Sequence, residues 1–198
     1  MKARWMLFLA SVTFAAAGFY LPAETGPAGA QIGCVPSTRM PVEGRASPYD
    51  SVNFTVGGKA AQVCYGRPYT KGRVVFGNLV KYDAIWRTGA NEPTILHIPF
   101  AASVGDVALE PGSYSIYTIP GQTSWSVIVN RSTSQWGHEN QYTPDVEAQE
   151  VGRTTVPSEA LEEPVEQFTI TAEPQDGNVT HLILDWERTR VRIPVTSR

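Results

Sequence analysis

The sequence is poor in the residues that build metal sites. It contains two cysteines and three histidines in 198 residues. His97, His138 and His181 stand far from one another and from both cysteines, whereas structural zinc sites use ligands a few residues apart. The chain also lacks HExxH, GxSxG, Walker and dinucleotide-binding motifs. We therefore predict neither a metal nor a cofactor.

Two further deficits exclude classes of partner. The chain has 16 Lys and Arg residues against 19 Asp and Glu, a formal net charge of −3 at pH 7. Nucleic-acid binding needs a strong basic excess, so nucleic acid is not an expected partner. The apolar run from Trp5 to Leu21 is followed by no second run of membrane length, so we expect no membrane span beyond it.

The first thirty residues have the order of a secretory signal. Lys2 and Arg4 give a positive start, the apolar run follows, and Ala28-Gly29-Ala30 is a small-residue cleavage signature. The sequence therefore predicts a signal peptide over residues 1–30 and an exported protein, periplasmic or extracellular. An uncleaved anchor is the alternative, because the apolar run is near the lower length limit for a span.

Both cysteines lie beyond that segment, and an even number in an exported protein favours a disulfide. A bridge between Cys34 and Cys64 would pin the N-terminal part of the domain to the strand around Val63. Two unpaired thiols are the alternative. Residues 31–48 are rich in Pro, Gly, Ser and Arg, which predicts an N-terminal arm or linker.

Residues 49–198 have the pattern of a single all-β domain. About ten short segments alternate apolar and polar residues between Gly and Pro turns, and Gly57-Gly58 is a clear hairpin signal. This is typical of an antiparallel β-sandwich of jelly-roll type. One helical turn is expected at Ser158–Glu163. The last four predicted strands are Gln149–Val156, Glu166–Ala172, Val179–Trp186 and Arg190–Val195.

Cationic and aromatic side chains gather between Tyr65 and Glu92, among turn-forming glycines. Guanidinium groups suit carboxylates and phosphates because they present a rigid fork of donors. Residues 131–148 form a long polar loop of the kind that often carries function. The predicted ligand-binding residues are Arg67, Lys71, Arg73, Trp86, Arg87, Asn91, Glu92, Trp136 and His138.

These residues also have structural interpretations. Large aromatic residues such as Trp86 are often core anchors. Arg87 could pair with Glu92 and Arg73 with Asp83, and the loop that follows Trp86 could be a corner whose side chains cap backbone groups. The sequence leaves both interpretations open.

Four motifs of the chain resemble a bacterial family labelled domain of unknown function 2911. Its patterns are R-P-x-x-K-G-R-x-x-F-G-x-L-V, W-R-x-G-A-N-E, G-x-Y-x-x-x-x-I-P and N-x-x-x-x-x-W-G. They correspond here to Arg67–Val80, Trp86–Glu92, Gly112–Pro120 and Asn130–Gly137. The resemblance runs from about Ser47 to Val195, with a departure at Lys81-Tyr82, where the family often has Pro-Tyr. It implies export from a bacterial cell and a β-rich domain, and it transfers no catalytic residue.

Three functional hypotheses follow. The first is a binding module for a polar or anionic small molecule or glycan, such as an envelope glycan. The second is a hydrolase with Glu92 or His138 as acid/base and Arg87 as oxyanion stabiliser. The third is a structural domain in which the arginines form an internal ion-pair lattice. Burial separates them, because lattice arginines would each meet a carboxylate or several carbonyl groups.

Overall fold

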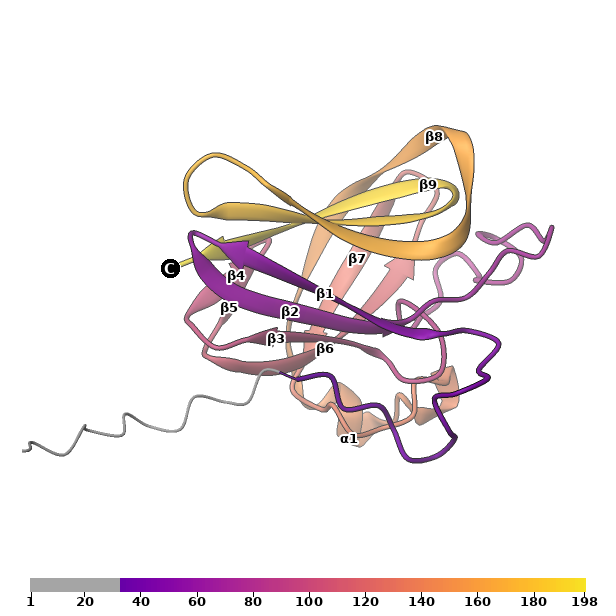
Figure 1. Cartoon of the computed structure of the whole chain (residues 1–198), viewed down its shortest axis with the longest axis horizontal. Helices are drawn as coiled ribbons and strands as arrows, with labels where there is room; N and C mark the ends of the chain where they lie inside the picture. The colour runs from indigo at the N-terminus through magenta and orange to yellow at the C-terminus, as the bar shows by residue number, and fades with distance from the viewer. Residues whose placement is uncertain (1–32) are drawn as a thin grey trace, which may run out of the picture.

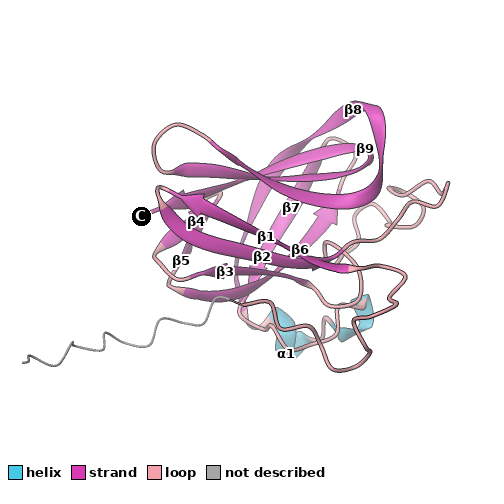
Figure 2. Cartoon of the chain, viewed as in Figure 1, coloured by secondary structure: helices cyan, strands magenta, loops and turns pink. Residues whose placement is uncertain are grey.

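The computed structural model describes residues 33–198 (Figure 1). They form one nine-stranded antiparallel sheet in the order β1-β2-β3-β6-β7-β8-β9-β4-β5 (Figure 2). The strands are β1 (Tyr49–Val56), β2 (Lys59–Gly66), β3 (Thr94–Ile98), β4 (Ala102–Val104), β5 (Val107–Leu109), β6 (Gly112–Pro120), β7 (Ser124–Asn130), β8 (Glu150–Pro174) and β9 (Val179–Ser197). The outermost strands β1 and β5 do not pair with each other, so the sheet is not closed. The predicted signal peptide lies outside the described residues.

Within residues 33–198, helix is confined to the long polar loop between β7 and β8. It comprises the 3₁₀ turn Glu139–Gln141 and the single α-helical turn α1 (Pro144–Glu147). Across residues 33–198, no helix is long and apolar enough to cross a membrane.

The two C-terminal strands are longer than predicted. The four segments expected as short strands merge into β8 and β9. β8 pairs with β7 as far as Pro157 and with β9 from Ser158 onward, so it passes from one half of the sheet to the other. In Figure 1 its second half and β9 lie next to β1. The helical turn predicted at Ser158–Glu163 is wrong, because Ser158 pairs with Val191 and cross-strand bonding outweighs the capping tendency of serine.

Predictions based on local patterns are confirmed. Gly57 and Gly58 have φ angles of 56° and 77°, the left-handed values that a two-residue type I′ hairpin requires. The turn aligns Val56 with Lys59 and sets the register of β1 against β2. In β9, Val191, Ile193 and Val195 are all buried, as their alternation with polar residues predicts.

Five aromatic side chains form the centre of the core. Trp86 and Trp186 stack with ring centroids 5.7 Å apart and an interplanar angle of 19°. Phe76, Trp125 and Phe168 pack around this pair. They come from β7, β8, β9 and the long connection between β2 and β3, so the cluster joins both halves of the sheet.

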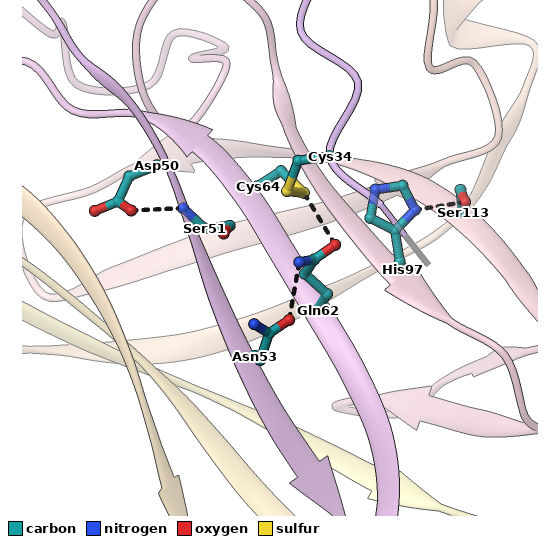
Figure 3. The surroundings of a disulfide bond; sticks show 8 residues. All are labelled: Cys34, Asp50, Ser51, Asn53, Gln62, Cys64, His97 and Ser113. Atoms are coloured by element: carbon teal, nitrogen blue, oxygen red, sulfur yellow. Dashed lines mark hydrogen bonds between the residues drawn. A yellow bond between two sulfur atoms is a disulfide. The ribbon is translucent and has the colours of Figure 1, made fainter. Parts of the chain in front are cut away.

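The disulfide between Cys34 and Cys64 is formed, with Cα atoms 5.6 Å apart (Figure 3). Cys64 is fully buried in β2, and Cys34 lies near the start of the described chain. The bond fixes the beginning of the arm, defined here as residues 33–48, against the sheet.

Loss of this bridge should destabilise the fold. Cys34→Ser removes it while leaving Cys64 in place. We expect the free energy of unfolding to fall by about 3 to 4 kcal/mol, because the bridge closes a 30-residue separation in the unfolded chain. Guanidinium chloride titration of the oxidised wild type, the reduced wild type and the variant measures the free energy of unfolding. The reduced wild type should have the same value as the variant. Equal midpoints for all three, or free thiols in non-reduced peptides, would contradict the prediction.

Candidate functional site

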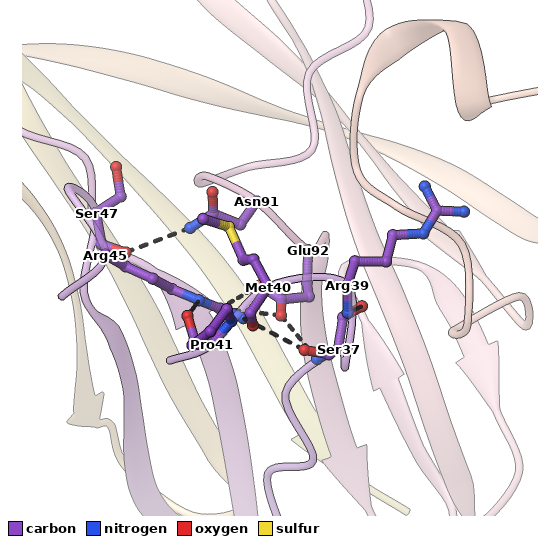
Figure 4. A network of polar contacts seen from close by, with 8 residues as sticks. All are labelled: Ser37, Arg39, Met40, Pro41, Arg45, Ser47, Asn91 and Glu92. Carbon is purple, nitrogen blue, oxygen red and sulfur yellow. Dashed lines mark hydrogen bonds and ion pairs between the residues drawn. The ribbon is translucent and has the colours of Figure 1, made fainter. Parts of the chain in front are cut away.

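A buried ion pair holds the arm against the loop that follows Trp86 (Figure 4). Arg45 Nη1 donates to both carboxylate oxygens of Glu92, at 3.0 and 2.9 Å. The two side chains are only 1% and 8% exposed. Arg45 also donates to backbone carbonyl oxygens of its own arm, those of Ser37, Met40 and Pro41. The guanidinium is thus surrounded by acceptors, as a buried charge must be.

Glu92 has a structural position. Its Oε1 accepts the backbone N–H of Ser37 at 2.7 Å in addition to the bonds from Arg45. Both carboxylate oxygens therefore serve to hold the arm, and this geometry favours the structural interpretation of Glu92 over an acid/base role.

Residues 86–92 form a tight corner that joins three segments. Thr88 and Asn91 have φ angles of 57° and 66°, which non-glycine residues seldom adopt. The Thr88 hydroxyl donates to Thr118 Oγ1 in β6 at 3.1 Å. Asn91 Nδ2 donates to the carbonyl oxygen of Ser47 in the arm, at 3.3 Å. The corner is therefore rigid and ties the arm to the sheet.

Gly137 brings the loop after β7 onto the same corner. Its N–H donates to the Asn91 carbonyl oxygen at 3.0 Å. A Cβ at this position would lie 2.6 Å from Arg87 Cδ, so only glycine fits. Two of the predicted segments, far apart in sequence, thus meet at Arg87.

Arg87 differs from the other predicted cations. It is half-buried, and within the described residues its guanidinium makes no hydrogen bond and no ion pair; the pairing with Glu92 is not formed. The Nε atom is inaccessible and has no partner. Burial lowers the pKa of Arg87, and the nearby Glu139 and Tyr117 partly offset that effect.

Arg67 belongs to an internal network. Its guanidinium donates to the Asp50 carboxylate at 2.9 Å, to Thr169 Oγ1 at 2.9 Å and to the Phe168 carbonyl oxygen at 3.2 Å. It thus joins the start of β1 to β8. This is the arrangement that the lattice hypothesis requires.

Arg73 and Lys71 lie on an exposed turn next to β8. Arg73 donates to the carbonyl oxygens of Tyr69 and Thr70, each at 2.8 Å, and the alternative pairing with Asp83 is not formed. The Lys71 backbone N–H donates to the Glu166 carboxylate at 2.9 Å. Arg67 and the backbone of this turn therefore contact β8, whereas Arg87 contacts the loop after β7.

The remaining predicted aromatic and imidazole groups lie apart from one another. Trp86 is in the core, where its Nε1–H donates to the Gly89 carbonyl oxygen. Trp136 is half-buried beneath Arg39, whose guanidinium carbon is 5.9 Å from the ring centroid. His138 is exposed, with Nδ1 3.3 Å from the Glu139 carboxylate.

A hollow of about 390 Å³ lies between the arm, β3, β6 and the loop after β7. Most of the described residues that line it have neutral polar side chains, apolar atoms contribute more of the lining surface, and no Lys or Arg among residues 33–198 contributes to it. Of the predicted ligand-binding residues, Glu92 alone lines it. The described residues that line it are Gly33, Val35, Pro36, Ser37, Thr38, Tyr49, Glu92, Ile95, His97, Ser113, Thr133, Ser134 and Gln135.

Two titratable groups in the lining are held neutral. His97 Nδ1 lies 2.8 Å from the hydroxyl of Ser113, its cross-strand neighbour (Figure 3), and burial lowers the pKa of His97. Burial and then the Glu92 carboxylate raise the pKa of Tyr49 to about 12, against a smaller opposing effect of Arg45. At neutral pH the hollow therefore offers an uncharged imidazole and a phenol.

Sequence reasoning missed Arg45, Tyr49, His97 and Ser113 as parts of this region. Arg45 lies in a segment with the composition of a linker and gives no local signal. His97 and Ser113 alternate with buried residues, which shows only that they face away from the core; their partnership depends on the register of β3 against β6.

The fold and the hollow together define the class of protein: an all-β domain in which a disulfide-anchored arm borders a polar hollow. The chain belongs to the family described as "Protein of unknown function (DUF2911)", whose model matches residues 47–195. The match includes both segments that meet at Arg87 and leaves Cys34 and Arg45 outside. No curated protein and no solved structure matches the chain. Among residues 33–198, no group of three or more His, Cys, Asp or Glu side chains could hold a metal ion.

Breaking the buried pair should cost much more stability than removing Arg87. Arg45→Met leaves the Glu92 carboxylate buried without its partner, and we expect a loss of about 3 to 5 kcal/mol. Arg87→Gln removes a charge that has no described partner, so its effect should stay within about 1 kcal/mol. Chemical denaturation measures both, and combining Arg45→Met with Glu92→Leu should recover much of the loss. Equal losses for Arg45→Met and Arg87→Gln would contradict this account.

The lowered pKa of His97 predicts a stability change in mild acid. As pH falls below about 6.5, the unfolded chain binds a proton that folded His97 still excludes. This contribution to stability is present above that pH and is lost as the pH falls through the folded-state pKa. The wild type should therefore lose more stability than His97→Gln between about pH 7.5 and pH 5. Parallel unfolding curves would show that His97 is not responsible.

Proposed function

We propose that the protein is an exported binding module for a small polar ligand, and that the hollow is its site. The observation that carries this proposal is the hollow itself. Its volume of about 390 Å³ falls in the range of small-molecule sites. Its walls are held by the disulfide at one end of the arm and by the Arg45–Glu92 pair near the other. A preformed site of this kind binds with little ordering cost.

The lining favours a neutral, hydroxyl-bearing ligand such as a short glycan, with envelope glycan as the natural candidate for an exported protein. Serine, threonine, glutamine and tyrosine side chains donate and accept hydrogen bonds in the way that sugar hydroxyls require. Val35, Pro36 and Ile95 add apolar surface suited to the C–H face of a sugar ring. No Lys or Arg of the described chain lines the hollow, which speaks against an anion as the part of the ligand that fills it.

The other two hypotheses differ in support. The lattice hypothesis fits Arg67 and Glu92, which bond internally, but not Arg87. A hydrolase is not favoured, because Glu92 is engaged by Arg45 and His138 lies on the exposed surface. Export is supported by the disulfide, since such bonds persist in oxidising compartments. A jelly-roll-like sandwich is supported by the aromatic contacts that join both halves of the sheet.

Filling the hollow should abolish binding without disturbing the fold. Ser113 is exposed in β6 and faces the hollow, so Ser113→Trp places an indole inside it at a position where strands tolerate aromatics. Thr155→Trp, at an exposed position in β8 outside the hollow, is the matched control. Calorimetric titration with a panel of neutral short oligosaccharides should detect binding by the wild type and the control only. The proposal fails if no oligosaccharide binds, or if Ser113→Trp binds as the wild type does.

A further inference from the structure

His97 and Ser113 form a hydrogen-bonded pair inside the hollow. His97 Nδ1 lies 2.8 Å from Ser113 Oγ, and both residues belong to the lining (Figure 3). They face each other because His97 in β3 is paired in register with Ser113 in β6. Within residues 33–198, neither side chain makes another hydrogen bond. The hydroxyl and the imidazole are therefore available to a molecule that occupies the hollow.

The geometry and the protonation state of the pair suit a nucleophile and its base. A serine hydroxyl becomes nucleophilic when a base within about 2.6–3.2 Å takes its proton. Burial lowers the pKa of His97, so its ring is uncharged at neutral pH and can accept that proton at Nδ1. The other described titratable groups in the lining are Tyr49, whose pKa is raised to about 12, and Glu92, whose carboxylate is bound by Arg45.

The surroundings of the pair suit an acyl group. Ile95 lies two residues before His97 on the same face of β3 and also lines the hollow, so it offers apolar contact to a methyl or short alkyl group. Thr133 and Ser134, in the loop after β7, add hydroxyl donors to the lining. Such donors can stabilise the negative oxygen that forms when a carbonyl group is attacked. An uncharged ester fits a lining to which no Lys or Arg of the described chain contributes.

We propose that His97 and Ser113 are a catalytic dyad that removes acyl groups from an O-acylated saccharide. The saccharide part rests on the proposed function, whereas the esterase part rests on the pair and its place in the hollow. The hydrolase considered above used Glu92 or His138, and this dyad involves neither.

The reaction has two steps. Ser113 Oγ attacks the carbonyl carbon of the ester while its proton moves to His97 Nδ1. The bond between that carbon and the sugar oxygen then breaks, and the sugar oxygen leaves with the proton from His97, so the acyl group remains on Ser113. In the second step, a water molecule gives a proton to His97 and attacks the acyl carbon. Ser113 Oγ leaves with that proton, and a free carboxylic acid is released.

Covalent labelling tests the dyad without reference to any saccharide. The probe is an alkyl fluorophosphonate, which bonds to activated serine hydroxyls and loses fluoride. Mass spectrometry should show one adduct, placed on Ser113 by peptide mapping. Ser113→Ala should stay unlabelled, and His97→Gln should label about a hundred- to ten-thousandfold more slowly, the range expected for loss of a general base. Ser51→Ala, which removes an exposed serine of β1 outside the hollow, is the matched control and should label as the wild type does.

The pH dependence of labelling separates a base from a structural hydrogen bond. The wild-type rate should rise with pH through the folded-state pKa of His97, which lies below about 6.5, because only the uncharged ring accepts the proton. His97→Gln should lose this dependence, and circular dichroism should show that it is folded. The inference is overturned if Ser113 carries no adduct, or if folded His97→Gln labels at the wild-type rate.

The saccharide part has its own readout. The probe is 6-O-acetylglucose, with the release of acetate followed by NMR. We expect release by the wild type and only background release by Ser113→Ala, which should still bind the oligosaccharides of the calorimetric panel. Oligosaccharide binding without labelling or acetate release would overturn the dyad and leave the proposed function standing. Labelling of Ser113 without oligosaccharide binding would support the dyad and count against the proposed function.

Discussion

The buried contact between Arg45 and Glu92 is the interaction on which the candidate site depends. A guanidinium is costly to remove from water, and five acceptors compensate it here: two carboxylate oxygens and three arm carbonyl groups. The arm has no strand of its own before β1, so its shape follows from this saturated charge and from the disulfide. The arm forms one wall of the hollow, so these two contacts also fix the position of that wall.

Local signals in the sequence predicted the local features of the fold well. The paired glycines at 57 and 58 fixed a hairpin, and the alternation of Val191, Ile193 and Val195 identified a buried face. The length of β8 was not predictable in this way. The segment around Ser158 contains a helix-capping residue and several glutamates, and only its pairing partner in β9 makes it a strand. Non-local pairing of this kind leaves no periodic trace in the segment itself.

The candidate site was likewise predictable from local signals only in part. Composition identified the cationic stretch between Tyr65 and Glu92, but in the structure its arginine side chains lie in two different places. Arg67 bonds to Asp50 and to β8, whereas Arg87 lies under the loop that contains Gly137. The sequence could not separate them, because two of the three acceptors of Arg67 are about a hundred residues away in the chain. Trp86, near the end of the same stretch, is in the core for a similar reason: its stacking partner Trp186 belongs to β9.

The topology of the arm also sets an order of events during folding. Arg45 and Glu92 are 47 residues apart, and the carboxylate reaches its place only after the connection between β2 and β3 has formed its corner. Contacts with such long sequence separation form after local hairpins, because closing the long loop costs conformational entropy before the contact contributes any stabilisation. The hairpin of β1 and β2 can therefore assemble with the arm still unattached. We therefore expect the hollow to form late as the chain folds and to be lost early when the native state opens locally.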